Sequence, residues 1–212
     1  MENFFNFFST LLFMKRPLFV SFSGTHCVGK STLLKEIANK LKRKGYSVIE
    51  VEEYARKVPR EFHGTLKGQQ LMFEILKKEL VKASTKDADI VLIDRSPIDI
   101  IYYILFFACA KQWTVEEIKS SVKFLKDTSE LISKFDLLFY IDGVDAINIA
   151  DDGFRFTDEH SRHAVDLIAK SFYVLARNLG FIKIKQKANA VAETANEIID
   201  LIESKIRNKS KK

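Results

Sequence analysis

The strongest chemical signal in the chain is an octapeptide, GTHCVGKS, at positions 24–31. It fits the pattern G-x-x-x-x-G-K-[ST] completely. Bare backbone at the two glycines lets consecutive N–H groups converge on phosphate oxygens, and the positive end of a following helix stabilises the same anion. The pattern therefore predicts a loop that binds the phosphates of a nucleotide. The predicted binding residues are Gly24, Thr25, His26, Cys27, Val28, Gly29, Lys30, Ser31 and Thr32.

Three side chains supply the chemistry at this loop. Lys30 can reach the β- and γ-phosphates as a catalytic residue, and the hydroxyl of Ser31 can hold Mg²⁺. Asp94 ends the apolar run Ile90–Asp94, where it can orient Mg²⁺ through water. We therefore expect ATP and Mg²⁺ as cofactors, with Ser31 and Asp94 as the metal residues.

The elements that must position these residues alternate along the chain from Pro17 onward. Short β-rich runs are followed by longer segments of helical periodicity, which is typical of a parallel sheet covered by helices. The predicted fold class is α/β, the three-layer P-loop nucleoside triphosphate hydrolase fold, with a five-stranded parallel sheet and helices on both faces. The expected strands are Leu18–Ser23, Tyr46–Val51, Ile90–Asp94, Phe135–Asp142 and Phe181–Lys185.

Helix boundaries follow from turn and cap residues. Gly45 is expected to end the first helix, and Gly180 is expected to end a long helix over Asp158–Leu179. The helices are expected to begin near Ser31, Gly68, Ile98, Thr114, Asp158 and Ala190.

One domain is expected over residues 17–205, because the chain shows no internal repeat and no Gly/Ser linker. Residues 1–16 form an apolar extension with three open alternatives: a helix packed on the domain or a partner, a weak interfacial anchor, or an extension before a later start at Met14. Residues 206–212 form a basic tail. No apolar run approaches the ~20 residues that span a bilayer.

Charge and cysteine content narrow the function classes. The net charge is +6, but five of the basic residues lie in the last eight positions, and the rest of the chain is close to neutral. A near-neutral body offers no broad surface for a nucleic acid, so no dedicated nucleic-acid binding is expected. Two cysteines cannot build a disulfide framework, which favours a reducing, cytoplasmic compartment. The oligomeric state is open, with a homodimer among the alternatives.

The residues after Asp94 discriminate among classes of P-loop protein. A motor-type ATPase would carry Glu directly after this Asp and a GTPase would carry Gly three residues on, but Arg95 and Pro97 stand there. The chain also has no Asn-Lys-x-Asp motif for guanine. Arg95 would direct a fixed cation at transferred or acceptor phosphate, or it would form a structural ion pair at the strand end.

Three further segments accompany the loop: Val51–Arg56, Asp94–Asp99 and Asp152–Arg155. Together they resemble the AAA-like ATP-binding domain family that includes the ribosylnicotinamide kinase domain and, more distantly, thymidylate and deoxynucleoside kinases. The resemblance covers most of residues 17–205. It implies a kinase for a small acceptor, with nicotinamide riboside one candidate among several.

The resemblance also implies roles for residues at the strand ends. A carboxylate after the second strand contacts or deprotonates the acceptor hydroxyl in such kinases, which implies this role for Glu53, with Glu52 as the alternative. Arg56, Asp94 and Arg95 would join Glu53 on the substrate side. Surface charge is the alternative interpretation of the two glutamates and of Arg56.

A lid is implied by the resemblance over residues 151–162. Arg155 and Arg162 would close over the γ-phosphate as catalytic cations. The alternatives are a solvated loop charge for Arg155 and a helix ion pair with Asp158 or Glu159 for Arg162.

The base-binding residues are less well defined. The run Tyr102–Ala110 is expected to be core helix, with an aromatic clamp on the acceptor base among Tyr102, Tyr103 and Phe106 as the alternative. The resemblance places Lys185–Asn189 beside the adenine.

These residues predict ATP- and Mg²⁺-dependent phosphoryl transfer to a small nucleoside, nucleotide or nucleoside-like acceptor. The rival interpretation is an ATP-binding regulatory or interaction module with slow hydrolysis. A nucleic-acid-stimulated ATPase is a third class. Release of ADP that depends on a small acceptor separates the first interpretation from the other two.

Overall fold

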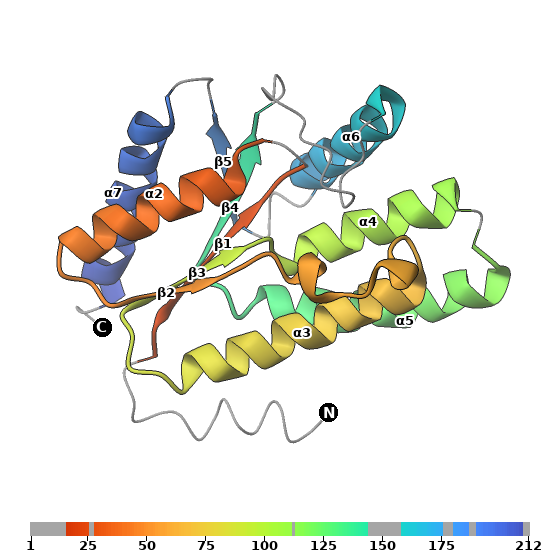
Figure 1. Ribbon diagram of the computed structural model, residues 1–212, viewed down its shortest axis with the longest axis horizontal. Coiled ribbons are helices and arrows are strands. Elements are labelled where there is room, and N and C mark those ends of the chain that lie inside the picture. Colours follow the sequence, from red (N-terminus) through yellow and green to blue (C-terminus); the bar gives the residue numbers. More distant parts are fainter. Residues whose placement is uncertain are drawn as a thin grey trace.

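The computed structural model describes residues 16–25, 28–111, 113–143, 158–175, 180–186 and 190–209. In this part of the chain a five-stranded sheet has the strand order β2-β3-β1-β4-β5, and every pairing is parallel (Figure 1). The strands are β1 Leu18–Ser23, β2 Val48–Val51, β3 Ile90–Asp94, β4 Leu137–Asp142 and β5 Phe181–Lys185. The predicted parallel sheet is confirmed.

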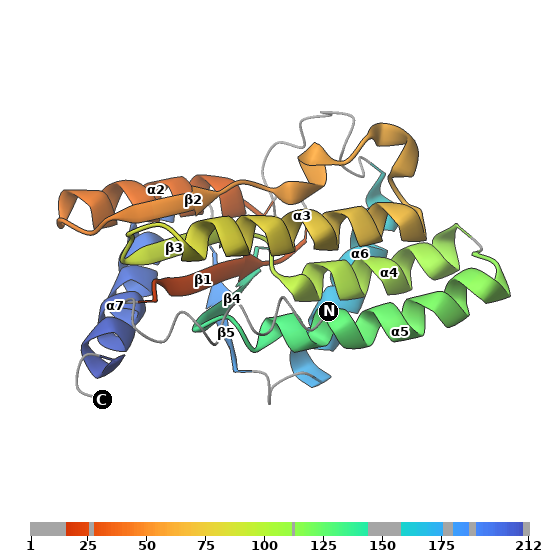
Figure 2. The same ribbon diagram turned by 90° about the horizontal axis from the view of Figure 1, so that it is seen from below.

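Helices connect the strands and lie on both faces of the sheet. They are α2 Lys30–Arg43, α3 Leu66–Ser84, α4 Pro97–Ala110, α5 Val115–Ile132, α6 Glu159–Leu175 and α7 Val191–Lys209, with short 3₁₀ turns η1 Tyr54–Lys57 and η2 Arg60–Phe62. Helices α2 and α7 cover one face, and α3, α4, α5 and α6 cover the other (Figures 1 and 2). The three-layer α/β fold class is therefore confirmed.

Alternating residues of each strand divide between the two cores. Phe22 of β1 and Phe139 of β4 stack at 5.6 Å between ring centroids on the α2 and α7 side. Val91 and Ile93 of β3 face α3 and α4 instead. Because both faces are buried, these strands are mostly apolar, as expected for a parallel sheet.

Several boundaries differ from those expected. Strand β2 begins at Val48 and not at Tyr46, because the backbone N–H and hydroxyl of Ser47 donate to the Asp89 carboxylate. Strand β4 begins at Leu137, since Phe135 still donates its N–H to Ile132 at the end of α5. Helix α7 continues through Lys209, so it includes the first four residues of the expected basic tail.

Cap residues explain where two helices begin. Ser96 and Asp99 form a capping box at α4, with Pro97 in the first turn. Thr114 and Glu117 form another capping box at α5, which confirms the expected start at Thr114. The expected long helix is α6, which ends at Leu175 in the described ranges.

The N-terminal segment 1–15, with its three alternatives, lies outside the described residues. Within the described ranges, no helix is both long enough and apolar enough to cross a membrane.

Helix α3 packs closely against the 3₁₀ turn η2 at Gly68. A Cβ on Gly68 would lie 2.0 Å from the carbonyl oxygen of Phe62. Gly68→Ala in an ordinary helix would add about 1 kcal/mol of stability. Here we expect a loss of about 1–3 kcal/mol because backbone must move.

Urea unfolding measures this change, with the exposed neighbour Lys67→Ala as the control. A Gly68→Ala protein as stable as the wild type would contradict the close packing of η2 on α3.

Candidate active site

The phosphate loop leaves β1 at the carboxyl edge of the sheet and ends at α2. Gly24 and Gly29 both have positive φ, 144° and 79°. A Cβ at Gly24 would lie 2.6 Å from the carbonyl oxygen of Ile141, and one at Gly29 would lie 2.9 Å from Nε2 of Gln186. Both positions therefore need glycine for conformation, and Gly24 needs it for space as well, because its near neighbour is backbone. His26 and Cys27 lie outside the described residues.

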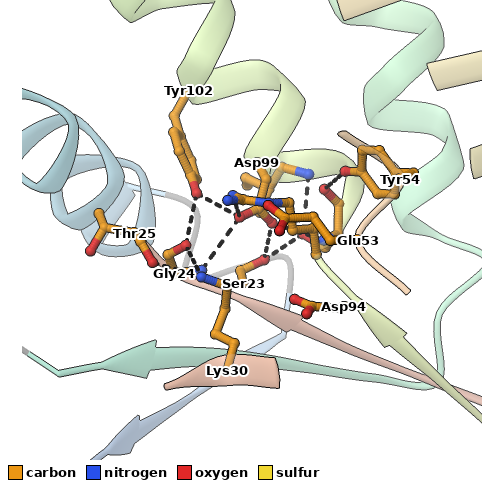
Figure 3. Close-up of polar contacts among 12 residues, drawn as sticks. Ser23, Gly24, Thr25, Lys30, Glu53, Tyr54, Asp94, Asp99 and Tyr102 are labelled. Atoms are coloured by element: carbon orange, nitrogen blue, oxygen red, sulfur yellow. Dashed lines mark hydrogen bonds and ion pairs between the residues drawn. The ribbon is translucent and has the colours of Figure 1, made fainter. Parts of the chain in front are cut away.

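Lys30 is the first residue of α2, and its side chain turns back over the loop. Its ammonium donates to the carbonyl oxygens of Gly24 at 2.8 Å and Thr25 at 2.6 Å (Figure 3). An ammonium has three N–H donors, so two hold the loop around the cation and one remains to meet a phosphate oxygen.

Burial makes this cation unusual. Desolvation, followed by the positive charge of Arg95, lowers the pKa of Lys30 from 10.5 to about 8, although Asp94, Asp99 and Glu53 raise it. The ammonium therefore lies within electrostatic reach of residues at the ends of two different strands, β2 and β3. A phosphate placed against it would restore the missing negative charge.

Ser31 and Asp94 form the candidate metal site. The hydroxyl of Ser31 donates to Oδ2 of Asp94 at 2.5 Å. Oδ1 of Asp94 is buried and has no hydrogen-bond partner in the described structure. Hard oxygen donors of this kind fit Mg²⁺, which keeps several waters and takes few protein ligands. The described residues contain no cluster of three or more His, Cys, Asp or Glu that could hold a metal ion. Thr32 lies next to this pair on an exposed part of α2.

Arg95 follows β3 in a strained conformation. Its φ is 83°, the one positive value at a non-glycine residue in the described ranges, and it is 4% exposed. Its Nε donates to Oε1 of Glu53 at 2.5 Å and its Nη1 to Oδ1 of Asp99 at 3.3 Å. Its guanidinium also lies 5.4 Å from the ring centre of Tyr103. Burial lowers the pKa of Arg95, but Glu53, Tyr103, Tyr102 and Asp99 outweigh it and raise the pKa well above its ordinary value.

The structure places Glu53 in the site and Glu52 on the surface. Glu53 follows β2 and uses both carboxylate oxygens: Oε1 pairs with Arg95 and Oε2 with Nε of Arg56 at 3.2 Å. Arg56 itself is 43% exposed in its side chain. Glu53, Arg56, Asp94 and Arg95 therefore lie at one edge, as strand-end positions predict.

Asp99 is a residue that the motifs did not single out, yet it connects the whole site (Figure 3). It is 1% exposed and accepts hydrogen bonds from the Ser23 hydroxyl at 2.8 Å and the Tyr102 hydroxyl at 2.5 Å. The N–H of Gly24 points at it from 3.4 Å. The capping-box spacing from Ser96 to Asp99 was the available signal.

The aromatic residues of α4 belong mainly to the core. Tyr102, Tyr103 and Phe106 are all buried there, which confirms the core interpretation. Tyr102 nevertheless reaches the loop, because its hydroxyl lies 3.1 Å from the carbonyl oxygen of Gly24.

Two glutamine side chains were not anticipated. Gln69 on α3 is 1% exposed, and its Oε1 has no hydrogen-bond partner in the described structure. Gln186 follows β5 with its amide against Gly29, and its buried Oε1 likewise has no partner there. Of the expected adenine segment 185–189, Lys185 and Gln186 are described.

The predicted lid residues lie only partly within the described residues. Arg155 lies outside the described residues. Arg162 lies in the first turns of α6, half-buried, and among the described residues its guanidinium forms no ion pair with Asp158 or Glu159. Helix α6 also reaches the loop, since the hydroxyl of Thr25 donates to Oδ1 of Asp166 at 3.4 Å.

Together, the parallel sheet, the phosphate loop and the charged residues at the strand ends define a P-loop protein of the kinase type. The chain belongs to the AAA domain family, whose model matches residues 19–193.

Individual relatives agree with this assignment. A probable thymidylate kinase of Sulfurisphaera tokodaii is 27% identical over 206 residues, which cover 90% of this chain and 98% of that protein. Deoxyadenosine kinase from M. mycoides, solved with dCMP and dCDP, has a TM-score of 0.68 at 18% identity, over 88% of this chain and all of that one.

The NadR protein in complex with NR gives a TM-score of 0.64 at 18% identity. That match covers 90% of this chain but spans 52% of the NadR chain. The sequence relative is a kinase, and the solved structures share the fold. Together they favour a kinase of the nucleoside and nucleotide type.

The depressed pKa of Lys30 makes stability depend on pH. Between about 8 and 10.5 the unfolded chain holds a proton that folded Lys30 has lost. The wild type should therefore gain about 1–3 kcal/mol of unfolding free energy relative to Lys30→Met as the pH rises through this window.

Urea unfolding at the two ends of the window measures the difference. Lys35→Met, an exposed lysine of the same helix, is the control and should show no such trend. A difference between wild type and Lys30→Met that is independent of pH would contradict the buried cation.

Proposed function

We propose that this protein transfers the γ-phosphoryl group of ATP to a small nucleoside, nucleotide or nucleoside-like acceptor in the cytoplasm. One observation carries the proposal: Oδ1 of Asp99 lies 3.4 Å from the backbone N of Gly24 in the phosphate loop and 3.3 Å from Nη1 of Arg95. A phosphate held by the loop would therefore lie close to the acceptor-side residues.

Lys30 would bind the β- and γ-phosphate oxygens and neutralise charge that develops during transfer. Ser31 and Asp94 would hold Mg²⁺, which when bound neutralises further charge on the phosphates. Gln186 is placed to accept a hydrogen bond from the nucleoside part of ATP, because its buried Oε1 lies beside the loop.

Glu53 would receive the acceptor hydroxyl. The hydroxyl oxygen forms a bond to the γ-phosphorus as the bond to ADP breaks, and its proton passes to the Glu53 carboxylate. Because both oxygens of Glu53 are paired with arginines, the carboxylate is held in place, and its main work is to orient the hydroxyl. Positioning of this kind supplies most of the effect in phosphoryl transfer.

Arg155 and Arg162 would close over the γ-phosphate as cations of a lid. The lack of an ion pair between Arg162 and Asp158 or Glu159 in the described part of α6 supports this use. An arginine supplied in this way stabilises the charge of the transition state.

Gln69 would accept a hydrogen bond from the acceptor. A buried amide oxygen without a partner costs free energy, and a ligand donor that reaches it recovers that cost. Gln69 shares the core-facing side of α3 with Phe73, beside the aromatic residues of α4. A planar, polar base fits such surroundings.

The proposal is tested by release of ADP from Mg-ATP in the presence of a panel of nucleosides, nucleoside monophosphates and nicotinamide riboside. We expect one acceptor class to accelerate the release. Glu53→Gln should slow turnover about 100-fold while ATP affinity stays within a few fold. Lys30→Met should abolish turnover.

Glu52→Gln, the exposed neighbour, is the matched control and should behave as wild type. Acceleration by a macromolecule instead of any small acceptor would indicate the regulatory module. A salt-sensitive response to oligonucleotides would indicate a nucleic-acid-stimulated ATPase.

The role of Gln69 has a separate test. Gln69→Leu removes the unpartnered oxygen, so the variant should be at least as stable as wild type. The KM for the acceptor should rise about tenfold, the value of one hydrogen bond, while the KM for ATP is unchanged.

Steady-state kinetics in both substrates measures the effect, with Gln70→Leu on the same helix as the control. An unchanged acceptor KM in Gln69→Leu would remove Gln69 from the acceptor site.

A further inference from the structure

Helix α6 carries a line of polar side chains that connects the phosphate loop to the sheet. Arg162, Asp166 and Lys170 are spaced four residues apart, so they lie on one face of the helix. Asp166 receives the Thr25 hydroxyl at 3.4 Å and pairs with Nζ of Lys170 at 2.7 Å. In Figure 3, Thr25 lies beside this helix.

The line continues into the sheet. Lys170 lies 3.7 Å from Asp142, the last residue of β4, and Asp142 pairs with Lys183 of β5 at 2.7 Å. Partial burial lowers the pKa of Lys170, but the hydrogen bond and charge of Asp166 and the charge of Asp142 raise it overall. The charges of these side chains therefore alternate in sign from Asp166 through Lys170 and Asp142 to Lys183.

Apolar packing also holds α6. Val165 and Ala169 are buried in the core, and Tyr173 stacks on Tyr140 of β4 at 5.1 Å between ring centroids. A small hollow between α4, α6 and the sheet is lined by Tyr102, Tyr140, Ala169, Phe172 and Tyr173, among others, and it removes part of the contact that would otherwise fix the helix. The polar line therefore contributes to where α6 lies.

We infer that Asp166 is a positioning residue: its contacts with Thr25 and Lys170 set where α6 lies relative to the phosphate loop, and so where Arg162 lies relative to the transferred phosphate. The inference rests on the proposed function. Arg162 lies one turn from Asp166, about 6 Å along the helix axis. A displacement of Asp166 therefore moves Arg162 by a comparable amount.

The main test is a double-mutant cycle on acceptor-dependent turnover with Asp166→Ala, Arg162→Ala and the combined variant. Asp166→Ala should lower kcat about tenfold or more, with the Kd of ATP within about threefold. In the Arg162→Ala background the same change should cost less than about twofold, because the residue that it positions is gone. Multiplicative losses, or no loss in Asp166→Ala, would overturn the inference.

Two further variants separate positioning from simple stability. Asp166→Asn keeps an oxygen for the Thr25 hydroxyl but loses the charge that Lys170 needs, so its kcat should fall between wild type and Asp166→Ala. Glu159→Gln is the control, because Glu159 forms an exposed pair with His163 at 3.5 Å on the same helix. Its kcat should equal that of wild type, and equal losses in Glu159→Gln and Asp166→Ala would overturn the inference.

A readout independent of turnover is hydrogen exchange over residues 159–170. ATP should protect these amides in wild type, and Asp166→Ala should lose that protection while it still binds ATP. If ATP binds both proteins and protects α6 equally, the inference alone fails. If wild type does not bind ATP, the proposed function fails, and the inference fails as well because it rests on that function.

Discussion

The guanidinium of Arg95 is buried at the carboxyl edge of the sheet, and a buried cation costs several kcal/mol unless carboxylates surround it. Two carboxylates meet that need from different elements, Glu53 after β2 and Asp99 in the first turn of α4. The ion pairs therefore connect the ends of two strands with the start of a helix. Arg95 also has a left-handed backbone, with φ at 83°, a strain of the kind that functional sites retain.

Asp99 also links the buried guanidinium of Arg95 to the phosphate loop. The same carboxylate that pairs with Arg95 accepts the hydroxyls of Ser23 and Tyr102. Ser23 is the last residue of β1, directly before the loop. One buried side chain, Asp99, therefore contacts both the acceptor-side cation Arg95 and the segment that leads into the phosphate loop. A shift in either of them would displace the other.

Most of the fold could be predicted from the sequence because its signals are local. Apolar runs bounded by polar residues predicted the strands, and the phosphate loop between Leu18–Ser23 and the next helix has a pattern that few other structures satisfy. The part of the candidate site that strand ends form could be predicted, because the carboxyl ends of parallel strands meet at one edge of the sheet. That rule placed the residues after β2 and β3 beside the loop, and the resemblance to kinases selected Glu53 among them, with Glu52 as the alternative.

The roles of the remaining site residues could not be predicted from the sequence, because these roles depend on tertiary contacts. Gln69 looks like any polar helix residue until α3 buries it, and Asp166 becomes informative when α6 is placed beside Thr25. Asp99 could be predicted as a helix cap, but its contacts with Arg95 and Tyr102 required the folded chain. Periodicity reports which face of a helix is buried, and it does not report which polar groups meet there.

Charge balance explains why this arrangement suits a phosphate and a divalent cation together. Lys30, Arg95 and Arg56 supply three positive charges, and Glu53, Asp94 and Asp99 supply three negative ones. The loop N–H groups favour an anion, while the unpartnered Oδ1 of Asp94 favours a cation. A nucleotide that arrives with its metal satisfies both, whereas either charge alone would leave the opposite preference unmet.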